Sequence, residues 1–498
     1  MNVISRFFSE LVSEDRARGI DAGKLDKLSA WNPLAMSAVE DMRELTRIRG
    51  KSRDLYQNND LAHSLINKRV NAAIGHGITP QAATSVEAFN ELVDRQFDTW
   101  AMRCSPMAGL TFYGIQNQST LGRGTSGEAF VLRIEPPPDA KMKVPLRLKV
   151  LEADMLDHGK NVEQTADGGR IVQGVECDKW ERVTHYWFHH NHPGDTFGWA
   201  RKTSETHLRW PQKDVAHVWD VYNSRPSQVR GLPWLTSVVK KIKALDKYES
   251  AEQLKQEIAA CFGLVVEGAE ESTAYKSKGA SGRLCDANGV PIDAIFPGMT
   301  AYAPEGATIK TVQPSSVLGV PEYMSDKKHG ISAALGVPYA MATGDLSKVN
   351  FSSSRYGQGT FLRLVGAEVW LCIIPTLCDR VWQWWTEAAY DAGVIQTPVV
   401  PVEWTTQQFP SVNPLQDAQA EYRRLRMGTA NLTMIMAEQG NNWRRVLRQR
   451  AKENAFLDGE EITLDSDPRY RTQAGTTQPV YDTEETQPSK KKAKGKAA

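Results

Sequence analysis

The spacing of apolar and polar residues divides the first half of the chain into helical and β-rich regions. Apolar residues recur at helical spacing from Asn59, which can act as an N-cap, until Gly75 and Gly77 end the run. A second helical stretch covers about residues 85–100. Short alternating runs between Pro, Gly and Asp clusters then extend from about Gly109 to Asn223. This texture predicts an antiparallel β-rich region.

Long helices are predicted in the second half. Pro233 suits the first turn of a helix of about 30 residues, roughly 45 Å long. Residues 269–304, rich in Gly, Ala, Ser and Pro, predict a small and mostly extended excursion. Helical spacing returns over about residues 321–335. We therefore expect two helices that flank a small insertion.

A further long helix is predicted to begin near residue 352 and to continue as far as Gly393. Ser352 or Ser353 can cap it, and Pro375 should bend it. Its tryptophans exceed what one buried stripe needs, so we expect some rings to reach a neighbouring layer or subunit. They are Trp370, Trp382, Trp384 and Trp385.

The C-terminal region is predicted to form three short helices over residues 413–457. Asn413 precedes a proline, and Gly428 and Gly440 divide the run. After residue 460 the chain loses apolar content and ends in SKKKAKGKAA, which predicts a solvated tail. The lysines of this tail can bind DNA without sequence preference or simply favour solubility.

Composition adds bounds to this picture. A chain of 498 residues with 41% hydrophobic and 24% charged residues predicts a folded protein of two to four sub-regions. The formal net charge is only +1, with 60 basic and 59 acidic residues. This balance argues against a protein that wraps nucleic acid in positive surface. A near-neutral charge suits a protein that must not bind nucleic acid tightly.

Several sequence features point to assembly in the cytoplasm. The six cysteines show no CxxC spacing, which is typical of reduced thiols. No stretch of about 18 uncharged apolar residues is present, and the N-terminus carries acids. We therefore expect no membrane span and no signal peptide. The protein should be cytosolic or end up in a particle assembled there.

Motifs for common enzyme chemistry are missing. The chain has no GxxxxGK[ST] phosphate loop, no HExxH, no GxSxG, and no GxGxxG after a strand. We therefore expect a protein that is not an enzyme. A nuclease with a diffuse carboxylate site remains the enzymatic alternative.

Three histidines and three carboxylates are candidate metal ligands by residue type: His189, His190, His192, Glu152, Asp154 and Asp157. Neighbouring strand residues point to opposite faces, and the local sequence completes no four-ligand set. A strand end that runs into the turn HPGD explains the histidines, and solvent-facing positions explain the carboxylates. No metal and no cofactor are therefore predicted.

A lysine group lies at the start of the first long helix. These side chains can contact phosphates or form a solvated face balanced by nearby glutamates, and both readings stay open. The residues are Lys240, Lys241, Lys243 and Lys247.

Residues 336–357, GVPYAMATGDLSKVNFSSSRYG, closely resemble a segment of lambda-type portal proteins of tailed phages, where a helix ends, a loop follows and a long helix begins. Other segments agree in the same order. They are SRDLYQNNDLAHSLINKRVNAAIGHGI, LEADMLD, HPGD, QVRGLPWLTSVVKKI and NPLQDAQAEYRRLRMG. The resemblance therefore spans about residues 40–460.

The resemblance implies an α+β portal fold with a β-rich wing, a two-helix stem, a small clip, a long kinked wing helix and a helical crown. The implied boundaries are 1–230 for the N-terminal region and wing, 231–264 and 317–338 for the stem helices, 265–316 for the clip, 339–354 for the tunnel loop, 355–410 for the long wing helix and its exit, 411–460 for the crown and 461–498 for a flexible tail.

The implied function is a ring of about 12 subunits at one capsid vertex, through which double-stranded DNA is packaged, retained and ejected. Implied partners are the terminase large subunit, the major capsid or scaffold protein, and a head-completion or tail-connector protein. The location is the virion, after assembly in the host cytoplasm. Another structural virion protein is the main alternative. The channel residues expected in the tunnel loop are Gly344, Lys348, Asn350, Ser352 and Arg355.

Overall fold

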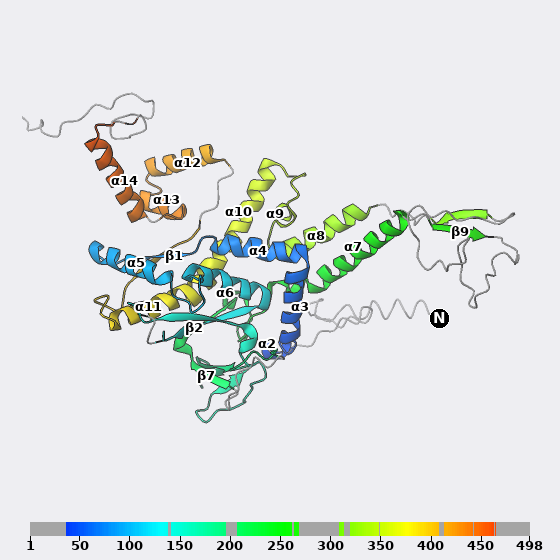
Figure 1. The fold of residues 1–498 in the computed structure, drawn as a ribbon, viewed down its shortest axis with the longest axis horizontal. Helices are drawn as coiled ribbons and strands as arrows, with labels where there is room; N and C mark the ends of the chain where they lie inside the picture. Colours follow the sequence, from blue (N-terminus) through cyan, green and yellow to red (C-terminus); the bar gives the residue numbers. More distant parts are fainter. Residues whose placement is uncertain are drawn as a thin grey trace, which may run out of the picture. The chain divides into compact units, whose positions relative to one another are not determined.

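The computed structural model shows a mixed fold of helices and sheets, as the α+β class requires (Figure 1). It describes residues 36–137, 141–195, 207–260, 263–267, 308–312, 319–347, 349–407, 413–441, 443–462 and 464. The predictions for the first 35 residues, for most of the clip, for Lys348 and for residues 465–498 lie outside this part of the chain.

The described chain divides into two compact units. Unit 1 comprises Met1–Ile66, Ser119–Leu132 and Val150–Thr343. Unit 2 comprises Asn67–Gln118, Arg133–Lys149 and Gly344–Ala498.

The α-helices are α2 (Ala38–Asp41), α3 (Leu45–Asn58), α4 (Asp60–Ile74), α5 (Glu87–Ala101), α6 (Phe112–Ser126), α7 (Val239–Ala260), α8 (Val320–Ala334), α9 (Tyr339–Thr343), α10 (Phe351–Glu368), α11 (Asp379–Asp391), α12 (Pro414–Arg426), α13 (Leu432–Glu438) and α14 (Trp443–Gly459). Short 3-10 turns are η4 (Ala153–Met155), η5 (Gln212–Asp214), η6 (Val221–Asn223) and η7 (Trp234–Ser237), and η8 (Val369–Cys378) is a π-helix.

The strands are β1 (Thr79–Ala82), β2 (Glu128–Ile134), β3 (Arg147–Glu152), β4 (Arg170–Val172), β5 (Val175–Cys177), β6 (Val183–His189), β7 (His207–Pro211), β8 (Val215–Trp219), β9 (Gly263–Glu267), β10 (Thr308–Val312) and β11 (Val402–Thr405). They form sheets of order β3-β2-β8 and β4-β5-β6-β7, and the pairs β1-β11 and β9-β10. The β4–β7 sheet is antiparallel throughout.

Helix ends follow the signals in the sequence. The Asn59 side chain accepts a hydrogen bond from the Ala62 amide at 3.0 Å, and α4 stops before Gly75, whose φ is +53°. The Asn413 side chain caps α12 in the same way through the Gln416 amide at 3.3 Å. The predicted N-terminal helix and the three C-terminal helices are confirmed at these positions.

The prediction of β structure from Gly109 onward is wrong for its first part, because residues 112–126 form helix α6. Glycines lowered the apparent helical propensity of this segment. Two of them are needed for close packing: a Cβ on Gly124 would lie 2.8 Å from the Trp234 ring, and one on Gly122 would lie 3.2 Å from Ala129. Tertiary contact therefore outweighs local propensity here.

A helix pair flanks the β9–β10 hairpin in the sequence. Helix α7 is shorter than expected because the 3-10 turn η7 precedes it. Helices α7 and α8 lie side by side (Figure 1), joined by the ion pair of Lys328 with Glu249 at 2.8 Å and by the rings of Tyr248 and Tyr323 at 5.2 Å. The two predicted helices are therefore present, while most of the predicted insertion between them lies outside the described residues.

A buried charge cluster forms the centre of unit 1. Glu128 at the start of β2 is fully buried and pairs with Arg49 of α3 and with Arg230, both also buried. Its other carboxylate oxygen accepts hydrogen bonds from His217 at 2.8 Å and from the Gly231 amide at 3.0 Å. The cluster therefore joins four segments far apart in the sequence.

In this cluster, two buried guanidinium groups share one buried carboxylate. Burial alone would raise the pKa of Glu128, but Arg230, Arg49 and the His217 hydrogen bond outweigh it and hold that pKa well below its usual range. Burial lowers the pKa of Arg49 to about 10. Burial also lowers the pKa of His217, and its Nε2–H donates to the carboxylate, since an ionised carboxylate can only accept.

Backbone carbonyls complete the solvation of the two guanidinium groups. Arg230 donates to the Gln173 carbonyl at 2.7 Å and to the Ala153 carbonyl at 3.0 Å, and Arg49 donates to the Ser126 carbonyl at 2.9 Å. These bonds connect the β4–β5 turn and the end of α6 to the same centre. Because every charge has partners, the penalty of burying it is offset.

Gly231 lets the chain pass close beside this centre. A Cβ at this position would lie 2.0 Å from the Gly127 carbonyl oxygen, too close for any side chain. The next residues pack in turn: Leu235 is fully buried, and the Trp234 indole donates to Asp220 at 2.9 Å. The RGLPWL segment is therefore fixed by contacts within unit 1.

An aromatic cluster forms the core of unit 2. The Phe97 ring lies 5.2 Å from the rings of both Trp382 and Trp385, and 5.6 Å from that of Phe112. The Trp382 indole donates to the Val400 carbonyl at 2.8 Å, so its polar atom is satisfied.

Residues 352–391 form one continuous run of α10, η8 and α11. Pro375 lies inside the π-helical stretch η8, a distortion that accommodates a residue without an N–H. By length and composition this helix is apolar enough to cross a membrane, although no uncharged apolar stretch of that length was found in the sequence. Half of its most apolar part is buried in the protein, which is also typical of a core helix.

We predict that Glu128→Gln destabilises the subunit by about 3–5 kcal/mol, because it removes the carboxylate that pairs with buried Arg230 and leaves buried Arg49 with a 3.5 Å contact to Asp154. Urea unfolding followed by tryptophan fluorescence measures this. Glu181→Gln is the matched control, since Glu181 makes an exposed ion pair with Arg170 and its loss should not change the midpoint measurably. Equal midpoints for Glu128→Gln and the wild type would contradict the role of the cluster.

Candidate nucleic-acid interface

The lysines of α7 are exposed in unit 1. None of Lys240, Lys241, Lys243 and Lys247 is buried against the subunit core. Lys243 forms an ion pair with Asp246 at 2.8 Å, one turn along the same helix. The helix thus carries a mixed solvated face with cations available, and the choice between phosphate contact and a plain solvated face stays open.

Asn350 is held by local hydrogen bonds at the start of α10. Its side chain accepts from the Ser353 amide at 2.8 Å, and the Ser353 hydroxyl lies 3.1 Å from the Asn350 amide, which forms a capping box. The prediction that Ser352 or Ser353 is the N-cap is wrong, because Asn350 occupies that position. Ser353 takes part in the capping box from the third position, and Ser352 is exposed in the first turn.

The loop before α10 has its own turn. Gly344 adopts φ +76° with open space around its α-carbon, and the Asp345 carboxylate accepts from the Ser347 amide at 3.0 Å. Lys348, the other expected cation of this loop, lies outside the described residues. The loop is therefore built from a left-handed glycine and an Asp turn.

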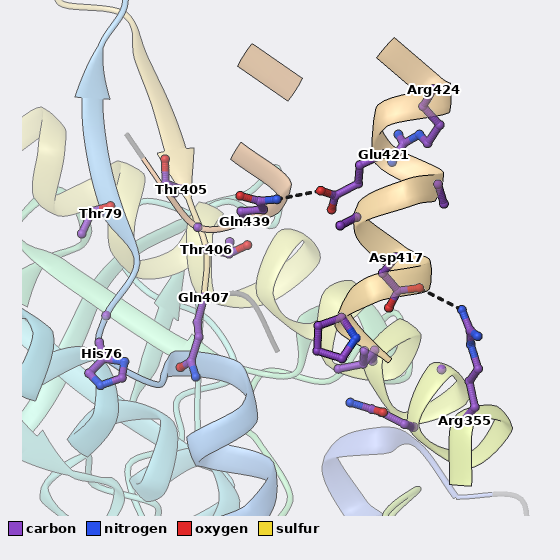
Figure 2. A pocket seen from close by; sticks show the side chains of 18 residues that line it. His76, Thr79, Arg355, Thr405, Thr406, Gln407, Asp417, Glu421, Arg424 and Gln439 are labelled. Carbon is purple, nitrogen blue, oxygen red and sulfur yellow. Dashed lines mark hydrogen bonds and ion pairs between the residues drawn. The ribbon is translucent and has the colours of Figure 1, made fainter. Parts of the chain in front are cut away.

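Arg355 lies on the wall of a groove in unit 2 of about 1220 Å³ (Figure 2). Its guanidinium donates to Asp417 of α12 at 3.1 Å, and both side chains remain substantially exposed. On the same wall Gln439 donates to Glu421 at 2.8 Å. Most of the residues that line the groove are polar, and its described lining holds no nucleophile with an adjacent base.

The tryptophans separate into two groups. Trp382, Trp384 and Trp385 are buried in the core of unit 2. Trp370 and its neighbour Leu371 are 55% and 56% exposed. Of the tryptophans expected to serve oligomer or core packing, Trp382 and Trp385 therefore pack in the core. Trp370 and its neighbour Leu371 are available for contact with another chain.

Five of the six histidines and carboxylates named from the sequence lie in two groups in unit 1, and His190 belongs to neither group. Asp157 and His189 meet His207, and Glu152 and Asp154 meet His192. His207 was missed because it lies on a different strand, and only the β6–β7 register places it beside His189. The alternation argument holds along one strand but says nothing of the neighbouring strand.

The chain is similar to known proteins over much of its length. It is 27% identical over 399 residues to a probable portal protein of Halomonas phage phiHAP-1. The aligned residues make up 75% of this chain and 73% of the relative. Solved structures of similar fold include chains from the neck of an empty GTA particle computed with C6 symmetry and from the neck of a native GTA particle computed with C12 symmetry. Each has a TM-score of 0.43 and 14% identity, and covers 80% of this chain and 94% of the other.

The model of one family matches residues 25–367, which is more than half of the chain. The matched range includes the buried charge cluster, the α7–α8 pair and the loop before α10. The chain therefore belongs to the phage portal protein family of the lambda type.

Proposed function

We propose that this portal protein assembles into a closed ring of about 12 subunits around an axial double-stranded DNA. The observation that carries the proposal is the α7–α8 pair, with the antiparallel strand pair β9–β10 between its helices in sequence. Repeated around an axis, such a pair forms a cylindrical wall with small hairpins at one end. Family membership supplies the context of a phage particle.

The parts of the subunit would divide this work. The sheets of unit 1 and the helix run of α10, η8 and α11 would form the wing, α7 and α8 the stem, and the β9–β10 region the clip. Residues 339–354 would be the tunnel loop and helices α12 to α14 the crown. The clip would meet the terminase large subunit during packaging and a head-completion or tail-connector protein afterwards.

In this proposal the protein has a structural role. It would sit at one capsid vertex in contact with the major capsid or scaffold protein, after assembly in the host cytoplasm. The DNA would be packaged, retained and ejected through the channel. The formal charge of +1 favours contacts that are weak and blind to sequence, which lets the polymer slide.

Negative-stain imaging of the purified protein tests the ring directly. The expected result is radial particles with a central hole. A minor capsid or tail-connector protein would give other shapes, and a nuclease would cleave DNA in the presence of a divalent metal. Monomers only, at the concentrations where phage proteins assemble, would contradict the proposal.

Trp370→Ala should reduce ring formation and leave the melting of the subunit unchanged, because this exposed indole would contact the neighbouring subunit. Trp385→Ala is the comparison, since its fully buried ring should cost about 3–5 kcal/mol of subunit stability. Light scattering and thermal unfolding measure the two effects. Intact rings for Trp370→Ala would show that this surface lies outside the subunit contact.

We expect Arg355→Ala to weaken the retention of double-stranded DNA in the ring several-fold at low salt, with the difference vanishing at high salt. Asp417→Asn is the matched control. It breaks the same ion pair but keeps the cation, so retention should stay at or above the wild-type level. Equal losses for both variants would mean that Arg355 acts only by joining α10 to α12.

A further inference from the structure

Three side chains of unit 1 converge beside the β4–β7 sheet. They are Asp157, which follows η4, His189 at the end of β6 and His207 at the start of β7. One ligand atom of each lies within 4.8 Å of the other two. The His207 Nε2 is 2.8 Å from one Asp157 carboxylate oxygen, and the His189 Nε2 is 3.6 Å from the other.

The backbone sets this convergence. His189 and His207 are direct partners in the antiparallel register of β6 and β7, so their side chains share one face of the sheet. The Asp157 amide donates to the Trp187 carbonyl at 3.0 Å, and Leu156 forms a bridge with Phe188. Hydrogen-bonded backbone from three chain segments thus fixes the three ligands.

The carboxylate is also oriented by a further contact. The Gly159 amide donates to the Asp157 Oδ1 at 2.8 Å. In the described part of the chain, the ion pairs of Asp157 are with the two histidines and involve no lysine or arginine. The three side chains are 16–26% exposed, so the group is accessible to small solutes from solvent.

Two imidazoles and one carboxylate form a donor set for a transition metal. Zinc takes such ligands at roughly 2.0–2.2 Å, which places neighbouring donors of a tetrahedral site about 3.3 Å apart. The separations of 2.8 Å and 3.6 Å between the histidines and Asp157 bracket that value. Mg²⁺ and Ca²⁺ prefer oxygen ligands throughout and fit the set poorly.

The second histidine group fits a metal less well. His192 lies 3.5 Å from Glu152 and 4.0 Å from Asp154. Asp154 already pairs with Arg49 and Arg53, so a cation there would have to compete with two guanidinium groups.

We propose that Asp157, His189 and His207 bind one divalent transition-metal ion, with Zn²⁺ as the expected species. Water would fill the fourth position. The ion links strands β6 and β7 to the segment after η4, and so stabilises the β4–β7 sheet. The site belongs to the folded subunit and does not depend on the ring.

Titration of the full-length protein, stripped with EDTA and dialysed, tests the site. Co²⁺ is the spectroscopic probe, and Zn²⁺ should displace it. The expected result is one equivalent per chain, visible d–d absorption bands, low-micromolar or tighter affinity for Zn²⁺, and a melting temperature raised by several degrees when Zn²⁺ is added. A large excess of Mg²⁺ should not compete.

Variants assign the ligands. His207→Gln and Asp157→Asn should each lose the Co²⁺ bands and at least tenfold in Zn²⁺ affinity, and His189→Gln replaces either variant that does not fold. The matched control is His185→Gln, on the same face of β6 but beside Glu176 and Arg209 instead of Asp157. It should bind as the wild type does.

Three outcomes would overturn the proposal. The first is that the wild type binds neither Co²⁺ nor Zn²⁺, which would mean that Asp157 and His207 form a hydrogen bond and no metal site. Alternatively, His207→Gln and Asp157→Asn bind as tightly as the wild type. Finally, the equivalent is lost in His192→Gln and kept in the other variants, which would move the site to the second group.

Discussion

The pairing of Glu128 with Arg49 and Arg230 is the constraint on which unit 1 depends. An isolated buried charge is too costly to persist, so each member of the cluster requires the other two and the carbonyls around them. Helix α3, strand β2 and the chain that enters α7 must therefore meet at one point. Helix α7 starts from this anchor, so its origin and direction are defined relative to the sheets of its unit.

The cluster also explains the character of two of the segments that resemble portal proteins. RGLPWL supplies a buried guanidinium, a glycine pressed against Gly127 and a fully buried leucine. The helix with SRDLYQ supplies Arg53, which pairs with Asp154 beside the same centre. These motifs fix the junction between the β-rich region and helix α7.

Short sequence motifs predicted the helix ends, because these depend on interactions between residues close in sequence. Caps such as Asn59 and Asn413 and glycines such as Gly428 mark helix ends because the hydrogen bonds there span only a few residues. Contacts between distant segments could not be read in this way. The partners of Glu128 lie 79 and 102 residues away. His207 was missed for the same reason, since only the register of two strands brings it to His189.

Two cations of the proposed channel parts have intramolecular partners: Lys243 pairs along α7, and Arg355 pairs with α12. In the proposed channel, contacts of these two side chains with DNA would compete with those partners, which would keep the contacts weak and sensitive to salt. Asn350 is engaged in its capping box and would add a neutral group at the start of α10. Weak contacts of this kind would let the proposed DNA substrate slide.

A cryo-EM reconstruction of the assembled protein with double-stranded DNA tests the portal account most directly. The account predicts a closed ring in which residues 344–350 lie nearest the axis, α7 and α8 form the wall, and the β9–β10 hairpins lie together at one end. An open or non-cyclic assembly, or a ring whose narrowest part is lined by other segments, would contradict it.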